Sequence, residues 1–373
     1  MKIAVLANFK QNAPTWEGMP PDQWDDLDSP KTVDHIIKAL ESGGHEARFF
    51  EASIRPPHNL IERLQEYQPD LCFNIAEGHF GDGREAQIPA VLEMLGIPYT
   101  GSKVLTLALT LDKPMTKRIL AYHGLPTPEF QVFESADEPI DDSLLDARGD
   151  LRFPMFVKPS REGTGMGVSA ESIVRSVAEL RAQVARQIER YSQPILVERY
   201  IKGREITVGV VGNLGSTAAR RLTEQTAPAV LPEELTFFPP LEVDLAAYDP
   251  SEAGLYTNRI KVEMAEDFRY LCPAPLDDDL RDLLFRLTAA VFRVTGSCDA
   301  ARVDFRLDEE DGNRPYILEI NPLPGLNPLY SDLCVEAYAY GWTYEQLINT
   351  IVQLAVERQA ARGVSIAARV RPW

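Results

Sequence analysis

Arg302-Val303-Asp304-Phe305, followed after a turn by Glu319-Ile320-Asn321, is the stretch of sequence that decides the fold. Alternation along a strand puts Arg302 and Asp304 on one face, and Glu319 and Asn321 on one face of the next strand. The apolar residues expected on the opposite faces are Val303, Phe305, Leu318 and Ile320. The segment between the strands, Asp-Glu-Glu-Asp-Gly-Asn, is typical of a turn. The pattern therefore predicts a hairpin.

Such a hairpin gathers two carboxylates, an amide and a guanidinium. Two carboxylates about 4 Å apart repel by roughly 4 kcal/mol at an effective dielectric of 20, and a proton or a cation removes that cost. Oxygen ligands of this kind suit Mg²⁺, which usually completes its coordination with water and substrate phosphates. The residues predict a divalent cation and a nucleotide partner. The alternative is a solvent-facing hairpin whose charges are only hydrated.

Length and charge narrow the class of protein. A chain of 373 residues suits two or three domains that share a long cleft. The net charge of -18 repels phosphate backbones and acidic membrane surfaces, so neither nucleic acid nor a membrane is the expected partner. The apolar run from residue 1 to 7 is too short for a signal peptide or a membrane span, and predicts a buried strand.

Four cysteines are scattered along the chain without a Cys-x-x-Cys pair, which predicts core thiols in a cytoplasmic protein. A nucleophilic role for Cys272 or Cys298 is the alternative, although no activating base stands beside either residue.

Hydrophobic periodicity predicts three domains, at 1–125, 126–212 and 213–373. The first domain reads as a parallel α/β unit, with strands at 2–8, 47–52 and 70–76, helices at 31–41 and 58–67, and a helix-strand pair at 85–100. The second begins after the linker at 124–128 and has strands at 153–158, 195–200 and 205–212 around a helix at 174–190. The third holds a poorly patterned stretch at 213–262, helices at 277–294 and 343–358, and the acidic hairpin. The loop at 10–30 is longer than a βα connection needs, and it either lines a cleft or forms a packed surface flap.

A lysine and a glycine-rich loop end the first strand of the second domain. Lys158 is followed by Arg161-Glu162-Gly163-Thr164-Gly165-Met166-Gly167, whose backbone N–H groups suit phosphate oxygens. The loop is neither a Walker A motif nor a dinucleotide fingerprint. Downstream, the strand that contains Glu198 turns polar and leads to Glu205, an arrangement suited to an adenine and its ribose. An ordinary hairpin with a salt-bridged acid is the alternative.

Together these segments resemble the ATP-grasp superfamily, and most closely its D-alanine:D-alanine ligase branch. The resemblance covers nearly the whole chain, through 77–83 with Gln87, 112–117, Lys158 with the glycine loop, 198–201, 272–274, 302–304 and 319–325. It implies an α/β and α+β architecture, namely an ATP-grasp fold behind an N-terminal Rossmann-like parallel-sheet domain. It also implies ATP as cofactor, two Mg²⁺ ions that Mn²⁺ can replace, and a homodimer.

The resemblance also implies roles for individual residues. Those that bind the nucleotide are Lys113, Lys158, Gly163, Thr164, Gly165, Met166, Gly167, Glu198, Arg199, Tyr200, Ile201 and Glu205. The metal ligands are Asp304, Glu319 and Asn321, and the catalytic group is Arg302, Lys261 and Gly325. In the implied reaction a carboxylate takes the γ-phosphoryl group of ATP, and an amine then displaces phosphate from the acyl phosphate to form an amide.

The substrate end departs from the family pattern. Glu77-Gly78 stands where the family has histidine-glycine, Val262 follows Lys261 where a tyrosine is expected, and Tyr330 with Ser331 falls where one serine is expected. Glu17 lies in the loop region that should supply an anchoring glutamate. We therefore expect small amino-acid or carboxylate substrates other than two D-alanines. Authentic D-alanine:D-alanine ligase activity is the alternative, and a non-catalytic nucleotide-binding module is a third possibility.

Overall fold

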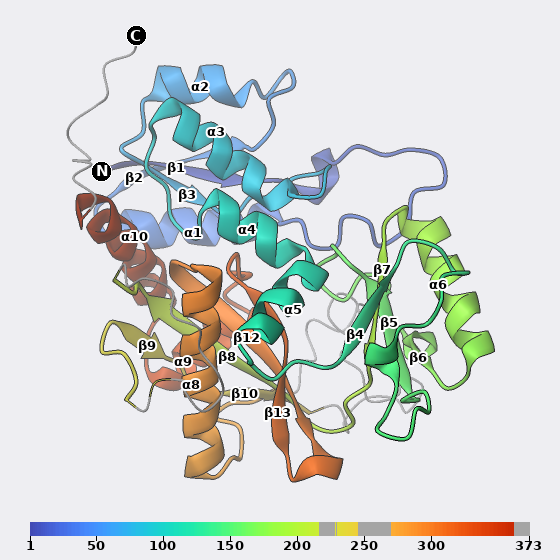
Figure 1. The fold of residues 1–373 in the computed structure, drawn as a ribbon. Coiled ribbons are helices and arrows are strands. Elements are labelled where there is room, and N and C mark those ends of the chain that lie inside the picture. Colours follow the sequence, from blue (N-terminus) through green and yellow to red (C-terminus); the bar gives the residue numbers. More distant parts are fainter. Residues whose placement is uncertain (216–227, 229, 245–269, 362–373) are drawn as a thin grey trace.

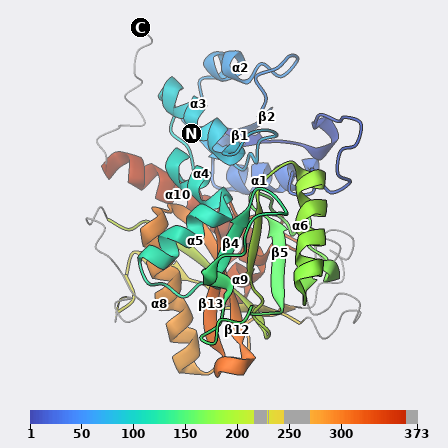
Figure 2. The ribbon, with the colours of Figure 1, turned by 45° about the vertical axis from the view of Figure 1, so that its right-hand side comes forward.

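The computed structural model describes residues 1–215, 228, 230–244 and 270–361. Three sheets organise this part of the chain (Figure 1). Turned by 45°, α8 (Asp278–Thr295) and α6 (Val177–Tyr191) lie on opposite outer sides, with the two antiparallel sheets between them (Figure 2). In the described residues, no helix is both long and apolar enough to cross a membrane.

The first sheet is parallel, with the order β2 (Glu46–Glu51), β1 (Lys2–Ala7) and β3 (Leu71–Asn74). Successive residues of β1 enter hydrophobic clusters on opposite faces, because helices cover both sides of a parallel sheet. The helices of this region are α1 (Pro30–Ser42), α2 (Leu60–Tyr67) and α3 (Gln87–Leu95). Ser29 caps α1 by accepting a hydrogen bond from the Thr32 N–H, and Pro30 occupies the first turn. The predicted parallel α/β unit is confirmed.

Two short helices connect the first sheet to the second. They are α4 (Val104–Leu111) and α5 (Lys113–Tyr122), for which the sequence analysis gave no element. Asp112 lies between them and caps α5 through the Met115 N–H, at 2.9 Å. The break between the helices places Lys113 at the very start of α5, beside the glycine loop.

The second sheet has four strands in the order β4 (Phe130–Phe133), β7 (Ile195–Arg199), β5 (Met155–Pro159) and β6 (Ile173–Val174), and α6 packs on it. All its pairings are antiparallel. One apolar stripe of α6, with Leu180 and Val184, is buried against β5 and β7.

The third sheet contains the decisive hairpin. Its order is β11 (Tyr270–Leu271), β10 (Leu241–Val243), β8 (Glu205–Gly212), β12 (Asp299–Asp308) and β13 (Arg314–Asn321), with β9 (Leu235–Phe237) also paired to β8. The remaining helices are α8, α9 (Asp332–Tyr340) and α10 (Tyr344–Ala361). Since β8 pairs with β12, residues 205–212 share a sheet with the C-terminal hairpin. The division of the chain at 125 and 212 stays a prediction.

The hairpin has the expected register at its functional end, where Asp304 pairs with Glu319 and Arg302 with Asn321. The expectation for Leu318 was wrong. A β-bulge follows Asp304, so that Phe305 pairs with Ile317, and Leu318 turns out of the core to line a cavity. Ile317 takes its place in the hydrophobic cluster.

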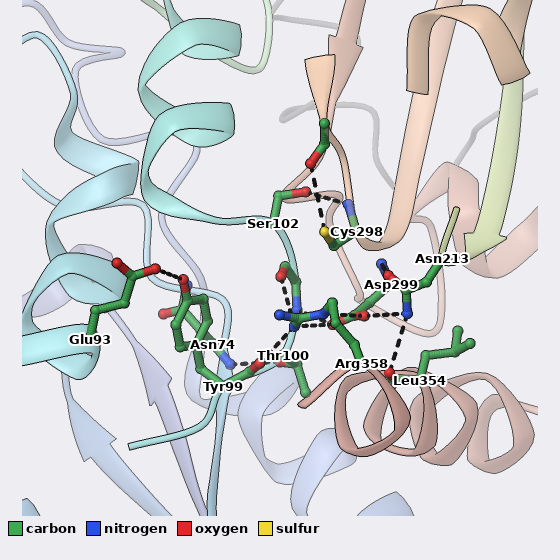
Figure 3. Close-up of polar contacts among 12 residues, drawn as sticks. Asn74, Glu93, Tyr99, Thr100, Ser102, Asn213, Cys298, Asp299, Leu354 and Arg358 are labelled. Atoms are coloured by element: carbon green, nitrogen blue, oxygen red, sulfur yellow. Dashed lines mark hydrogen bonds and ion pairs between the residues drawn. The ribbon is translucent and has the colours of Figure 1, made fainter. Parts of the chain in front are cut away.

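A buried ion pair ties the last helix to the rest of the molecule (Figure 3). Arg358 of α10 donates to both carboxylate oxygens of Asp299, at 2.8 and 3.0 Å, and to the carbonyls of Tyr99 and Gly101. The Gly101 N–H donates to Asp299 in turn, at 2.8 Å, and Asn213 bridges Asp299 to the Leu354 carbonyl. This junction joins β12, α10 and the segment before α4.

Candidate active site

A cavity lies where the four-stranded sheet meets the hairpin. Its lining residues come from β5, the glycine loop, the chain after β7, and β12 and β13. Among the predicted nucleotide ligands, the structure brings Lys113, Lys158, Gly165, Met166, Glu198, Arg199, Tyr200, Ile201 and Glu205 to this cavity. The roles assigned to them remain predictions, but their convergence from five separate segments is a property of the fold.

Two buried lysines share one carboxylate at the back of this cavity. Lys117 and Lys158 lie 2.7 and 2.8 Å from the two oxygens of Glu198. All three side chains are less than 10% exposed. Burial outweighs the attraction of Glu198 for Lys117 and lowers the pKa of that lysine to about 8. Burial opposes the charge of Lys158 too, but Glu198 and Glu319 raise its pKa above the ordinary value. Lys158 therefore presents a stable positive charge to the cavity.

The chain after β7 presents its backbone to the cavity. The Arg199 side chain points elsewhere, because its guanidinium binds Glu129 at 2.9 Å and Asp308 at 3.0 Å. Glu205, at the start of β8, lies 3.1 Å from Arg306. This geometry agrees with the expectation that the backbone of residues 199–201 and the carboxylate of Glu205 face a nucleotide.

The predicted metal ligands converge on the hairpin. Asp304 accepts hydrogen bonds from Thr207, from Asn321 and, through both carboxylate oxygens, from Arg302. A carboxylate has about four acceptor sites, so these donors saturate Asp304. Two carboxylates and an amide form a donor set that suits a hard cation. Binding of that cation would displace one donor, and rotation of the Asn321 amide exchanges its N–H donor for an oxygen.

Arg302 is held between two acids on the side of a second cavity. Its guanidinium contacts Asp304 at 2.8 Å and Asp332, at the start of α9, at 3.0 Å. Burial works against the charge, but Asp304 and Asp332 raise the pKa of Arg302 well above its usual value. A fixed cation in this position can neutralise an oxyanion that forms beside it.

The glycine loop separates the two cavities. Gly165 and Met166 line the first, and Gly163 and Thr164 line the second. The N-terminal loop at 10–30 holds the glycine loop in place, because Asp22 accepts hydrogen bonds from the Gly167 N–H at 3.1 Å and from the Tyr191 hydroxyl at 2.7 Å. Gly167 has φ +75°, and a β-carbon there would lie 2.7 Å from Pro159, so only glycine fits.

The second cavity has a volume of about 360 Å³. Lys113, Glu162 and Glu319 line both cavities, so the two spaces meet at these residues. Lys113 lies 3.3 Å from Glu319 and donates to the Glu162 carbonyl at 2.6 Å. A group that leaves the end of a nucleotide in the first cavity would therefore enter the second.

The substrate residues predicted from the sequence divide between this cavity and the surface. Glu77, Gly325, Tyr330 and Ser331 line it. Glu17 is exposed and lines neither cavity. Asp25, Asp26 and Asp28 of the same loop line it instead, and Trp24 is buried against Phe80. The loop is thus both a packed flap and a cavity wall. Lys261 and Val262 lie outside the described residues.

Sequence reasoning missed three charged residues of the site. They are Lys117, which pairs with Glu198; Arg84, which is 2.6 Å from Asp26; and Asp332, which pairs with Arg302. Lys117 had a usable signal, because its spacing from Lys113 puts both on one face of α5. Arg84 and Asp332 find their partners only through the tertiary fold.

The family model and the relatives, together with this fold, show the class of the protein: it is an ATP-grasp enzyme, a ligase that uses ATP to form C–N bonds. Within that class, the chain belongs to the D-alanine–D-alanine ligase family, since the model of the D-ala D-ala ligase C-terminus matches residues 119–353.

Known proteins agree with this assignment. The "D-alanine--D-alanine ligase" of Janthinobacterium sp. (strain Marseille) is 30% identical over 86% of this chain and 88% of its own length. The "uncharacterized protein y4sG" of Sinorhizobium fredii is 33% identical over 98% of this chain and 99% of its own length. The crystal structure of D-alanine–D-alanine ligase from Bacillus anthracis complexed with ATP covers 97% of this chain and 100% of its own, with a TM-score of 0.68 and 22% identity. This last likeness confirms the fold.

Proposed function

We propose that the protein joins the carboxylate of an amino acid to the amine of a different partner, through an acyl phosphate, with release of ADP and phosphate. The observation that carries this proposal is the shared wall of Lys113, Glu162 and Glu319 between the two cavities. With a nucleotide in the first cavity, its phosphoryl end would meet the second cavity there, so a carboxylate in that cavity could attack it.

The chain supplies charge and position for both steps. Lys113 and Lys158 bind the phosphates of ATP, and the glycine loop covers them. Asp304, Glu319 and Asn321 would hold Mg²⁺, which neutralises phosphate charge when bound. In the first step, a carboxylate oxygen bonds to the γ-phosphorus while the bond to the ADP oxygen breaks.

In the second step, the nitrogen of the amine bonds to the acyl carbon, the carbon–phosphate oxygen bond breaks, and the amine loses a proton as phosphate leaves. Arg302 lines the cavity in which this carbonyl would lie, and it stabilises the oxyanion. Gly325 lies in the same wall, where it leaves room for the substrate. No side-chain nucleophile takes part. Burial raises the pKa of Cys272 to about 12, which agrees with that assignment.

The second candidate is D-alanine–D-alanine ligase activity, which the names of the relatives favour. Against it stands the carboxylate of Glu77 where the family has a histidine. We also propose a homodimer and the division into three domains at 125 and 212.

Product analysis tests the proposal. Purified protein is incubated with ATP, Mg²⁺ and either D-alanine alone or a pooled amino-acid library, and products are identified by mass spectrometry. We expect ADP, phosphate and a new amide only with the library. Efficient formation of D-alanyl-D-alanine would favour the second candidate, and formation of AMP with pyrophosphate would contradict the acyl phosphate. Binding of ATP without turnover on any substrate would favour a nucleotide-binding module.

A further inference from the structure

The second cavity carries far more negative than positive charge. Eight carboxylates line it, against two lysines and one arginine. Three of the carboxylates pair with these cations, because Lys10 contacts Asp25, Lys113 contacts Glu319 and Arg302 contacts Asp332. An excess of acids remains on the side of the N-terminal domain.

We call this side the acidic wall, formed by Asp26, Asp28, Glu77 and Glu85. Asp26 and Asp28 precede α1, and Glu77 and Glu85 follow β3. Among the described residues, the cation paired with this wall is Arg84, whose guanidinium lies 2.6 Å from Asp26 and 3.5 Å from Glu77. The side chain of Arg84 is 8% exposed. Arg84 thus contacts two of the four carboxylates of the wall, Asp26 and Glu77.

Asp26 leaves a buried acceptor without a partner. Its Oδ2 accepts from Arg84, but its Oδ1 has no hydrogen-bond partner among the described residues, and the side chain is only 6% exposed. A buried carboxylate oxygen without a donor is costly. Because Asp26 lines the cavity, a ligand there can supply the missing donor.

Burial and mutual repulsion favour the protonated forms of the other carboxylates of the wall. Burial and the neighbouring carboxylates of Glu85 and Asp26 raise the pKa of Glu77 well above its usual value. Burial also raises the pKa of Glu85 to about 7, although Arg84 and Lys113 oppose the shift, and a hydrogen bond joins its side chain to Glu77. Asp28 behaves similarly, with a pKa raised to about 7 by burial. A bound cation could take the place of these protons.

We propose that one substrate carries an additional positively charged nitrogen, which does not react and which binds the acidic wall through Asp26, Glu77 and Glu85. This inference rests on the proposed ligase function and specifies its substrate class: a basic amino acid or a diamine. An attacking amine must be neutral, and an amino acid that reacts through its carboxylate already carries its α-ammonium, so the additional charge belongs to a further nitrogen of the molecule.

Two observations favour an organic cation over a metal ion. No group of three or more His, Cys, Asp or Glu in the described ranges has the arrangement of a metal site. The cavity, at about 360 Å³, also falls within the roughly 300–1,000 Å³ of common small-molecule sites, so it has the size to hold an organic substrate. An ammonium group on an alkyl chain meets both conditions.

Matched substrate pairs test the charge directly. Ornithine and norleucine have side chains of equal length, and so do 1,4-diaminobutane and pentylamine, while only the first of each pair carries the extra charge. ADP release is measured with each compound, alone and with the amino-acid library. We expect kcat/KM at least about 10-fold higher for one cationic member over its neutral partner, as a charge-assisted hydrogen bond provides. The pair that shows the preference identifies the source of the charge.

Two variants connect the preference to the wall. Glu85→Gln and Asp26→Asn should each reduce the ratio of cationic to neutral kcat/KM at least about 5-fold, while KM for ATP stays within about twofold. Because Asp26→Asn also disturbs Arg84, Glu85→Gln is the decisive variant. Glu62→Gln, at an exposed position of α2, removes a charge away from the cavity and should keep the wild-type ratio.

Calorimetry provides a readout without turnover. Ornithine or 1,4-diaminobutane binding to the ATP-loaded protein at pH 6.5 should release protons, seen as a heat that depends on the buffer. The groups facing the Glu77–Glu85 pair are Asp26, Asp28, Glu162, Arg84 and Lys113, so this wall is the expected source. Binding of the cation without ADP release would contradict the ligase function alone. Turnover with neutral partners equally well, or no binding of either cation, would overturn the inference.

Discussion

Replacing Glu198 by glutamine removes the one carboxylate that two buried lysines share. The ion pairs to Lys117 and Lys158 measure 2.7 and 2.8 Å, and at an effective dielectric of 20 each attraction is worth about 6 kcal/mol before desolvation is counted. Lys158 keeps the attraction of Glu319 and Glu205 in the variant. Lys117 is fully buried and keeps less attraction from other carboxylates once Glu198 is removed.

The loss of stability caused by Glu198→Gln has two contributions. With a pKa of about 8, keeping the Lys117 proton costs roughly 3 kcal/mol relative to an ordinary lysine, and releasing it at pH 7 costs roughly 5 kcal/mol. A variant that holds Lys117 neutral therefore loses roughly 1–2 kcal/mol at this residue. Loss of the charged hydrogen bond to Lys158 adds about 1.5–3 kcal/mol. We expect the free energy of unfolding to fall by about 3–4 kcal/mol at pH 7, in the range found when one partner of a buried pair is removed.

The penalty should depend on pH. The wild-type folded state keeps the Lys117 proton up to about pH 8. The part of the stability difference between wild type and Glu198→Gln that comes from this proton is therefore present below pH 8 and lost above it. Denaturant unfolding of both proteins at pH 7 and pH 9 should show the difference shrink by about 1 kcal/mol. Lys117→Met in the variant should restore part of the stability. A loss below 1 kcal/mol, or one unchanged at pH 9, would refute this reasoning.

Three further predictions concern the first cavity. Lys158→Ala should raise KM for ATP at least about 10-fold in the ADP-release assay, because a buried phosphate contact is lost. The control Lys31→Ala changes an exposed lysine and should leave KM for ATP unchanged. Equal KM values for the two variants would contradict the assignment of Lys158 to the phosphates. Asp304→Asn should lower kcat at least about 100-fold and weaken the Mg²⁺ dependence, and an unchanged Mg²⁺ titration would remove Asp304 from the ligands. Asp22→Asn should speed proteolysis of the glycine loop several-fold without ATP, and less so at saturating ATP; no change would show that Asp22 does not hold the loop.

Much of the fold is predictable because the pattern is local. The buried run of β1, the periodic helix α6 and the hairpin of β12 and β13 each follow from spacing and turn residues, and their bounds agree within a few positions. The short strands β9 to β11 carry too few residues for a period to appear. Leu318 fails for another reason, since a bulge adds one residue and reverses the alternation.

In the candidate site, too, residues in local motifs could be predicted, and residues brought together by the tertiary fold could not. Lys158, Glu198 and Asp304 were found because each belongs to a motif of contiguous residues, and they converge as expected. Of the acidic wall, Glu77 was predicted as a substrate residue, but Asp26 and Glu85 were not, because they are separated in sequence and acquire their shared environment only from the packing of a loop against η2 (Arg84–Ala86). Glu17 and Asp26 look equivalent in the sequence, and only the path of the loop distinguishes them.

The junction of Arg358 with Asp299 has a consequence for how the protein matures on the ribosome. Asp299 is fully buried, and its cationic partner lies in the last helix, 59 residues later. Until α10 leaves the exit tunnel, a folded C-terminal lobe would have to bury that carboxylate without its arginine, at a cost of several kcal/mol. The carbonyls of Tyr99 and Gly101 also accept hydrogen bonds from the Arg358 side chain. The nascent chain can thus complete its first sheet early, but Asp299 gains its arginine only after α10 has been synthesised and has packed.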